Sequence, residues 1–174
     1  RNPLLYKNVG VDGVKTGYLA VEKYSLASSM KKRDRRLIAV ASGFDTKNFR
    51  SSESLKLLNW GYRNTSTFEI VKKNITNFEI DTWLANTNKI NASSKEDYYI
   101  TINKKDIRHF TISLNYLGPI KAPIKKGDKI AELIVKKKDN IIKTLSLHAT
   151  EDQKKVNFFR SLMTSLNYLI WGDV

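Results

Sequence analysis

The residues best suited to chemistry in this sequence are Lys15, Thr16 and Gly17, which end a glycine-punctuated stretch at residues 9–17. On an exposed strand edge, a lysine ammonium and a threonine hydroxyl can together hold a carboxylate. A glycine beside them leaves room for an extended peptide to pair with the same edge. The triplet therefore predicts a site that grips a carboxylate-bearing peptide, provided that a strand edge presents it.

Thiol and metal chemistry have little support in the composition. The sequence contains no cysteine, which excludes disulfides, thiol catalysis and cysteine-based zinc sites. The two histidines, His109 and His148, lie far apart and lack carboxylates at metal-ligand spacing. We interpret both as strand-surface histidines and expect no metal.

The chain is strongly basic, with a formal net charge of +14 over 174 residues. Such a charge favours an anionic partner, but it does not choose between nucleic acid, phospholipid and an acidic wall polymer. The densest basic cluster lies at residues 31–36, which we interpret as a solvated hairpin tip. Contact of this cluster with anionic lipid or wall polymer is the alternative.

Two strands and a helix are expected to follow the triplet. Residues 24–30 and 36–42 have the composition of short strands and flank a polar turn, so they predict a hairpin. Thr46 or Ser51 can then cap a helix. Residues 1–63 are therefore expected to end a domain in which a helix packs on an antiparallel sheet.

The rest of the sequence divides into two further parts. Residues 64–148 alternate apolar and polar side chains in several short runs, which predicts antiparallel strands of a small all-β sandwich or barrel. Residues 149–174 instead space their apolar side chains as a helix does, with lysines nearby. Their terminal position favours an amphipathic membrane-associating helix over one docked on the protein's own core.

The region of the triplet resembles the D-alanyl-D-alanine carboxypeptidases, which are serine-type penicillin-binding proteins. The similar segments are residues 1–5 and 11–18 around the third active-site motif of that family, then 25–29 and 36–40, then 50–62. The resemblance continues more weakly to the end of the chain. It implies an α+β fold: the end of a penicillin-binding or β-lactamase-like transpeptidase domain, a small all-β sandwich domain and a C-terminal amphipathic helix.

The resemblance implies acyl transfer without metal or organic cofactor, in which a serine attacks the D-Ala-D-Ala carbonyl and water hydrolyses the acyl-enzyme. Lys15, Thr16 and Gly17 would then engage the terminal D-alanine of a peptidoglycan pentapeptide, or a β-lactam inhibitor. Lys15 would also supply positive potential at the nucleophile. The backbone N–H of Tyr18 would be an oxyanion donor. Arg50 would support recognition of the carboxylate, or else form a surface ion pair.

The resemblance places the nucleophile and a signal peptide upstream of Arg1, in a periplasmic protein held on the inner-membrane surface through residues 152–171. The isolated chain is accordingly expected to be inactive. Two serine-lysine pairs, Ser28 with Lys31 and Ser29 with Lys32, match the spacing of the nucleophile motif. Both lie on a predicted strand instead of a helix start, so we interpret them as chance matches.

Two other functions compete with the carboxypeptidase interpretation. The chain could be a non-catalytic β-rich binding module associated with an anionic membrane or the cell wall. Nucleic-acid binding would fit the charge, but aromatic residues are not interleaved with the basic cluster and no recognition motif appears. We therefore expect no nucleic-acid partner.

Overall fold

The computed structural model describes residues 1–157, 162–163, 166, 169–170 and 172, and it divides the chain into two compact units. The first unit comprises Arg1–Thr67 with Thr101–Lys105, and the second comprises Phe68–Ile100 with Asp106–Val174. The observed boundary after Thr67 lies inside strand β4 (Thr65–Val71), whereas the boundary expected after residue 63 falls in the last turn of the preceding helix. A short segment later in the chain also belongs to the first unit.

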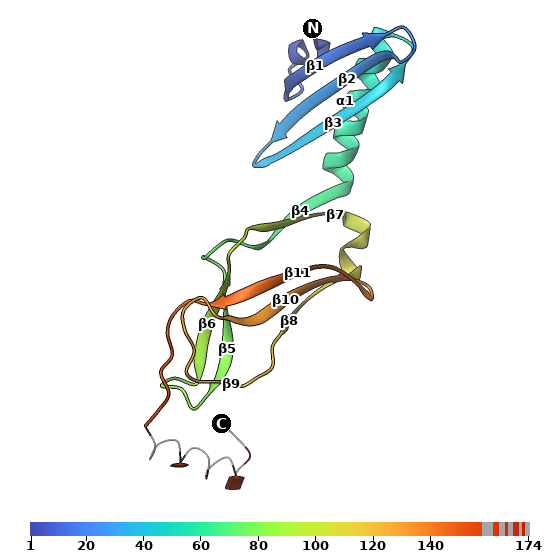
Figure 1. Ribbon diagram of the computed structural model, residues 1–174. Helices are drawn as coiled ribbons and strands as arrows, with labels where there is room; N and C mark the ends of the chain where they lie inside the picture. Colours follow the sequence, from blue (N-terminus) through green and yellow to red (C-terminus); the bar gives the residue numbers. More distant parts are fainter. Residues whose placement is uncertain (158–161, 164–165, 167–168, 171, 173–174) are drawn as a thin grey trace. The chain divides into compact units, whose positions relative to one another are not determined.

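The first unit is a three-stranded antiparallel sheet with one helix (Figure 1). Its strands lie in the order β1-β2-β3, and they are β1 (Val11–Leu19), β2 (Lys23–Lys32) and β3 (Arg35–Phe44). Helix α1 (Lys47–Asn64) follows, and a short 3-10 helix, η1 (Pro3–Tyr6), precedes β1. The hairpin and the helix predicted from the sequence are confirmed. Thr46 is the cap, because its hydroxyl oxygen accepts the N–H of Phe49 at 3.1 Å.

Helix α1 is fixed to the sheet by apolar packing and by one tyrosine. The core between them consists of Leu4, Val11, Leu26, Met30, Ala39 and Leu58. Gly61 permits the close approach, because a Cβ there would lie 2.8 Å from a methyl group of Leu37. The Tyr62 hydroxyl lies 2.6 Å from the carbonyl oxygen of Met30 and 2.9 Å from that of Arg35, so it ties the helix end to the hairpin.

Several side chains of the basic hairpin tip make contacts within the first unit. Arg36 forms an ion pair with Asp12 at 2.7 Å, and this contact lowers the pKa of the Asp12 carboxyl. Arg35 donates to the backbone carbonyl of Thr65 at 2.7 Å. Lys32 donates to the side chain of Asn59 at 3.2 Å. These contacts support the interpretation of this cluster as a structural hairpin tip.

The second unit is built mainly on a six-stranded sheet in the order β8-β10-β11-β6-β5-β9 (Figure 1). Its strands are β5 (Asn77–Trp83), β6 (Lys89–Ser94), β8 (Phe110–Asn115), β9 (Ile120–Lys121), β10 (Lys129–Lys137) and β11 (Asn140–Ala149). β4 pairs with β7 (Tyr98–Asn103) in a separate two-stranded ribbon, and the 3-10 helix η2 (Lys104–His109) precedes β8.

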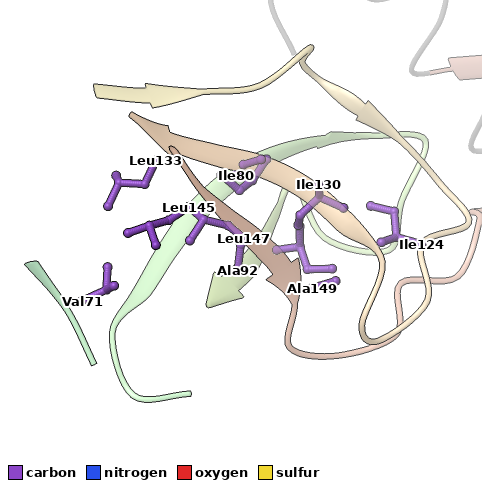
Figure 2. Packing of buried hydrophobic residues seen from close by; sticks show 11 residues of the cluster. Val71, Ile80, Ala92, Ile124, Ile130, Leu133, Leu145, Leu147 and Ala149 are labelled. Atoms are coloured by element: carbon purple, nitrogen blue, oxygen red, sulfur yellow. The ribbon is translucent and has the colours of Figure 1, made fainter. Parts of the chain in front are cut away.

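The apolar side chains of the alternating strands pack into one hydrophobic core, shown in Figure 2. Leu133 of β10 lies opposite Leu145 of β11, and Ala131 lies opposite Leu147, so one face of this pair is apolar. Burying one such leucine contributes about 1.5–3 kcal/mol. The antiparallel strands predicted from the period of two are confirmed. These strands form one mixed sheet, in which β9 runs parallel to β5 and β11 pairs with β6 only through Leu147–Ala149, together with the separate ribbon.

The helix expected at 149–174 is not formed over residues 150–157, where Gln153 and Lys155 make isolated bridges with Ile124 and Ala85 and Val156 is buried. The rest of the expected segment lies largely outside the described residues. The residues described there with helical backbone all have exposed apolar side chains, and they are Leu162, Met163, Leu166, Leu169 and Ile170. Within the described part of the chain, no helix combines the length and apolar character that crossing a bilayer requires.

Candidate carboxylate-binding site

The triplet Lys15-Thr16-Gly17 lies on an outer strand. In the three-stranded sheet, β1 is hydrogen-bonded to β2 on one side, and the described residues place no strand along its other side. Asn2 secures the upstream half of β1, because its side-chain amide donates to the carbonyl of Gly13 at 2.9 Å. The stretch from Lys15 to Tyr18 therefore presents free backbone groups with which an extended peptide can pair.

A hollow of about 510 Å³ lies beside this strand. Its walls come from three places in the first unit: the chain start, the β1–β2 hairpin and the first turn of α1. The lining residues are Arg1, Pro3, Thr16, Gly17, Tyr18, Tyr24, Lys47, Asn48 and Arg50. The structure thus brings Thr16, Gly17, Tyr18 and Arg50 of the predicted site together.

The hollow is electropositive. Its lining contains the cations Arg1, Lys47 and Arg50 and no carboxylate. The start of α1 adds the positive end of a helix dipole, since Lys47 and Asn48 occupy its first turn. A bound anion would compensate this charge, so the arrangement favours a ligand that carries a carboxylate or a similar group.

Arg50 is the lining residue with the strongest need for an anion. Its side chain is only 5% exposed, yet it forms no ion pair with any described residue. Its Nε is buried without a hydrogen-bond partner. The guanidinium lies 5.7 Å from the ring centre of Tyr24, a weak compensation for a buried charge. The surface ion pair considered as the alternative is therefore absent from the described structure.

Lys15 and Thr16 flank the open edge from opposite faces. Thr16 lies opposite the buried Leu26 and therefore faces the α1 side, where the hollow is. Lys15 lies opposite Ala27 on the alternate face, is exposed and does not line the hollow. Of the predicted pair Lys15 and Thr16, only Thr16 lines the hollow, and Arg50 lines it as well.

Gly17 is needed for packing inside the sheet. A Cβ at this position would lie 2.4 Å from the hydroxyl oxygen of Ser25, the residue opposite it on β2. The sequence analysis attributed the glycine to space for a substrate. The Ser25 side chain occupies the space on the Cβ side of Gly17, and Gly17 itself also lines the hollow.

Replacing Gly17 by alanine should lower the free energy of unfolding of the 174-residue chain by about 1–2 kcal/mol, because the new methyl group displaces the Ser25 hydroxyl. Adding Ser25→Ala should recover most of this loss, since the nearest remaining atom, Cβ of residue 25, would lie 3.8 Å away. Denaturant titration of both single variants and the double variant measures the coupling. Equal losses in Gly17→Ala with and without Ser25→Ala would contradict this role of the glycine.

Tyr18 contributes its ring as well as its backbone. The ring lies 4.7 Å from that of Tyr24, its partner across the hairpin, and both line the hollow. The sequence analysis missed five lining residues, which are Arg1, Pro3, Tyr24, Lys47 and Asn48. Only Tyr24 carried a usable signal, because the hairpin register places it opposite Tyr18.

The two serines of the chance motifs are unsuited to nucleophilic attack. Ser28 is fully buried, and its hydroxyl donates to the carbonyl of Ala39 at 3.3 Å. Ser29 is 5% exposed and accepts a hydrogen bond from Arg36. Both lie on β2 and not at a helix start, as predicted.

No group of acidic, histidine or cysteine side chains with a metal-binding arrangement occurs among the described residues. His148 uses its Nδ1 in a 3.0 Å contact with the carbonyl of Gly127. Since a carbonyl can only accept, Nδ1 is the donor in this contact.

Comparison with known proteins gives the family. The family model described as penicillin-binding protein 5, C-terminal domain, matches residues 66–155, just over half of the chain. The chain belongs to the penicillin-binding protein 5 family. The family resemblance seen in the sequence is therefore confirmed.

Named relatives in this family match almost the whole chain. It is 31% identical to the D-alanyl-D-alanine carboxypeptidase DacF of Bacillus subtilis, over 95% of the chain and 43% of that protein. It is 32% identical to DacC of Escherichia coli, over 91% of the chain and 40% of that protein. The crystal structure of penicillin-binding protein 5 from Haemophilus influenzae matches with a TM-score of 0.68 and 28% identity, over 88% of the chain and 45% of that structure. The chain thus spans less than half the length of these family members.

Proposed function

We propose that this chain forms the C-terminal part of a serine-type D-Ala-D-Ala carboxypeptidase, which removes the terminal D-alanine of peptidoglycan stem peptides through an acyl-enzyme. The observation that carries the proposal is the electropositive hollow beside the open edge of β1, with the buried, unpaired Arg50 in its wall. The relatives, which are named D-alanyl-D-alanine carboxypeptidases, support the same activity. They do not favour a non-catalytic binding module.

In this proposal the stem peptide lies extended along β1, and its backbone pairs with the free edge from Lys15 to Tyr18. The terminal carboxylate enters the hollow, where the Thr16 hydroxyl donates to it and the Arg50 guanidinium neutralises it. Peptides that lack a terminal carboxylate would lose both interactions. This selects the C-terminal residue of a peptide for removal.

The chemical step needs a nucleophile that we propose to lie upstream of Arg1. Lys15 lies on the face of β1 away from the hollow. Its positive charge would stabilise the negative charge that develops on the serine oxygen as this oxygen attacks. The backbone N–H of Tyr18 would donate to the oxyanion of the tetrahedral intermediate. A β-lactam, whose carboxylate resembles that of the substrate, would occupy the same hollow and acylate the serine. No metal or organic cofactor is required.

The experiment that tests this function uses the complete protein, produced with the sequence that precedes Arg1 in its gene. We expect release of D-alanine from diacetyl-L-Lys-D-Ala-D-Ala and covalent labelling by fluorescent penicillin. The 174-residue chain alone should show neither. Labelling of the isolated chain, or a complete protein that neither releases D-alanine nor reacts with penicillin, would overturn the proposal.

We further propose that the part of residues 152–171 that follows residue 157 holds the protein on the periplasmic surface of the inner membrane. The exposed apolar side chains of the residues described in this segment support an interfacial contact. Replacing both Leu166 and Leu169 by aspartate should reduce co-sedimentation with phosphatidylglycerol-containing vesicles at least about fivefold, because two charges would enter the apolar layer. Leu117, which is 98% exposed in the second unit, provides the control. An equal loss in Leu117→Asp would contradict the anchor.

A further inference from the structure

A second hollow lies at one end of the sheet in the second unit and has no place in the proposed carboxypeptidase function. Its volume is about 400 Å³, and three connecting segments converge on it: the β4–β5 turn, the β6–β7 turn and the loop before β10. The lining residues are Asn74, Ser93, Lys95, Lys126, Gly127, His148, Ala149 and Thr150. Every charged residue in this lining is basic.

The cations of this hollow are not neutralised within the described structure. Neither Lys95 nor Lys126 forms an ion pair with a described residue. The nearest carboxylates in sequence are already engaged. Glu96 pairs with Lys143 at 3.1 Å, and Asp97 accepts the backbone N–H of Lys73 at 2.7 Å.

The carboxylates on the other side of the hollow hold the backbone of the loop that carries Lys126. Asp152 accepts the backbone N–H of Lys126 at 2.7 Å, and Asp128 accepts that of Lys125 at 2.8 Å. Neither carboxylate lines the hollow. They therefore shape the loop while the hollow keeps its positive potential.

Ser93 adds a hydroxyl group to the lining of the hollow. The residue is only 7% exposed, and its hydroxyl forms no hydrogen bond with any described residue. It lies directly opposite His148 on β11, and both line the hollow. Because Ser93 lines the hollow and its hydroxyl has no partner among the described residues, that hydroxyl is available to a ligand there.

The hollow is rigidly built. The Gly127 N–H donates to the carbonyl of Ala149 at 2.8 Å, and the Ala149 N–H donates to that of Asp128 at 2.9 Å. Ala149 itself belongs to the packed core of the second unit, where Figure 2 shows it beside Leu147. The loop and the strand end are thus held together before any ligand arrives, which reduces the entropy cost of binding.

We propose that this hollow binds a phosphate-type oxyanion through the ammonium groups of Lys95 and Lys126 and the hydroxyl of Ser93. Two ammonium groups with a hydroxyl donor match a tetrahedral group with several anionic oxygens, for which lysine serves as a point charge. The phosphate comes either free in solution or as the phosphodiester of a wall polymer or lipid headgroup. This site is independent of the hollow beside β1.

Titration of the isotopically labelled 174-residue chain with inorganic phosphate tests the site by NMR at low ionic strength. We expect saturable shifts of the Lys95 and Lys126 backbone signals with a Kd of roughly 1–10 mM. The double variant Lys95→Gln/Lys126→Gln should bind at least about tenfold more weakly, and Ser93→Ala about threefold more weakly. Lys125→Gln removes an exposed charge adjacent in sequence and outside the lining, so it should change the Kd less than about twofold.

Two further arms identify the source of the phosphate. A soluble glycerol phosphate oligomer and vesicles of phosphatidylglycerol in phosphatidylcholine are each added in competition with inorganic phosphate. The competitor that represents the source should displace inorganic phosphate from the wild-type chain. Its affinity should fall in the Lys95→Gln/Lys126→Gln variant and stay unchanged in Lys125→Gln. Absence of saturable phosphate binding, or equal loss in Lys125→Gln and the double variant, would overturn the site.

Discussion

Replacing Arg50 by glutamine should lower kcat/KM for D-alanine release by the complete protein about 10- to 100-fold. Loss of one charge-assisted hydrogen bond to a carboxylate costs about 1.5–3 kcal/mol, which corresponds to this range. The loss should appear mainly in KM if Arg50 holds the substrate carboxylate equally in the ground and transition states. Hydrolysis rates with diacetyl-L-Lys-D-Ala-D-Ala at several substrate concentrations measure the two constants separately.

Two control variants separate recognition from folding. Arg63→Gln removes an exposed arginine from the last turn of the same helix, so it should change kcat/KM less than about twofold. Arg50→Lys keeps a charge but loses the planar fork of donors, so it should restore only part of the affinity. Thermal unfolding of each variant checks the fold, since Arg50 is buried. A folded Arg50→Gln variant with unchanged kcat/KM would remove Arg50 from the site.

The second large effect is expected for Lys15→Met, which should slow acylation by penicillin about 100-fold in the complete protein. Lys15 is exposed, has no ion pair among the described residues and lies on the face of β1 away from the hollow. In the proposed function its charge acts on the attacking serine and not on the carboxylate alone. Groups that stabilise developing negative charge in acyl transfer contribute effects of this size.

The rate constant for labelling by fluorescent penicillin under single-turnover conditions measures this effect without the deacylation step. Lys31→Met is the matched control, because Lys31 is an exposed lysine on the neighbouring strand β2. It should acylate at the wild-type rate. If Lys15→Met changes only the concentration dependence of labelling and not its maximum rate, Lys15 binds the carboxylate instead of supporting the nucleophile.

The local elements were predictable because their signals are local. The strands of the β2–β3 hairpin were evident from their composition, and helix α1 from two candidate caps, Thr46 and Ser51. Thr46 is the cap, and its hydroxyl needs only the N–H of Phe49 nearby. The alternating runs of the second unit were recognisable for the same reason. A side-chain period of two reports one buried face, as the opposed pair Leu133 and Leu145 shows.

The arrangement of the site was only partly predictable. Lys47 and Asn48 reach the hollow because α1 packs back on the sheet, and no local pattern encodes that approach. The reason for Gly17 lies in Ser25, a residue on another strand, so spacing within the triplet could not reveal it. The strand order of the mixed sheet likewise depends on which strands β11 pairs with along its length.

The most direct measurement is an NMR titration of the labelled 174-residue chain with diacetyl-L-Lys-D-Ala-D-Ala and with its C-terminal amide, because binding to the hollow does not require the nucleophile. The carboxylate form should produce saturable shifts at Thr16, Gly17 and Tyr18. The amide should bind at least about tenfold more weakly, and Arg50→Gln should remove the difference. Equal binding of both peptides by the wild-type chain, or shifts confined to other parts of the chain, would contradict a carboxylate site beside β1.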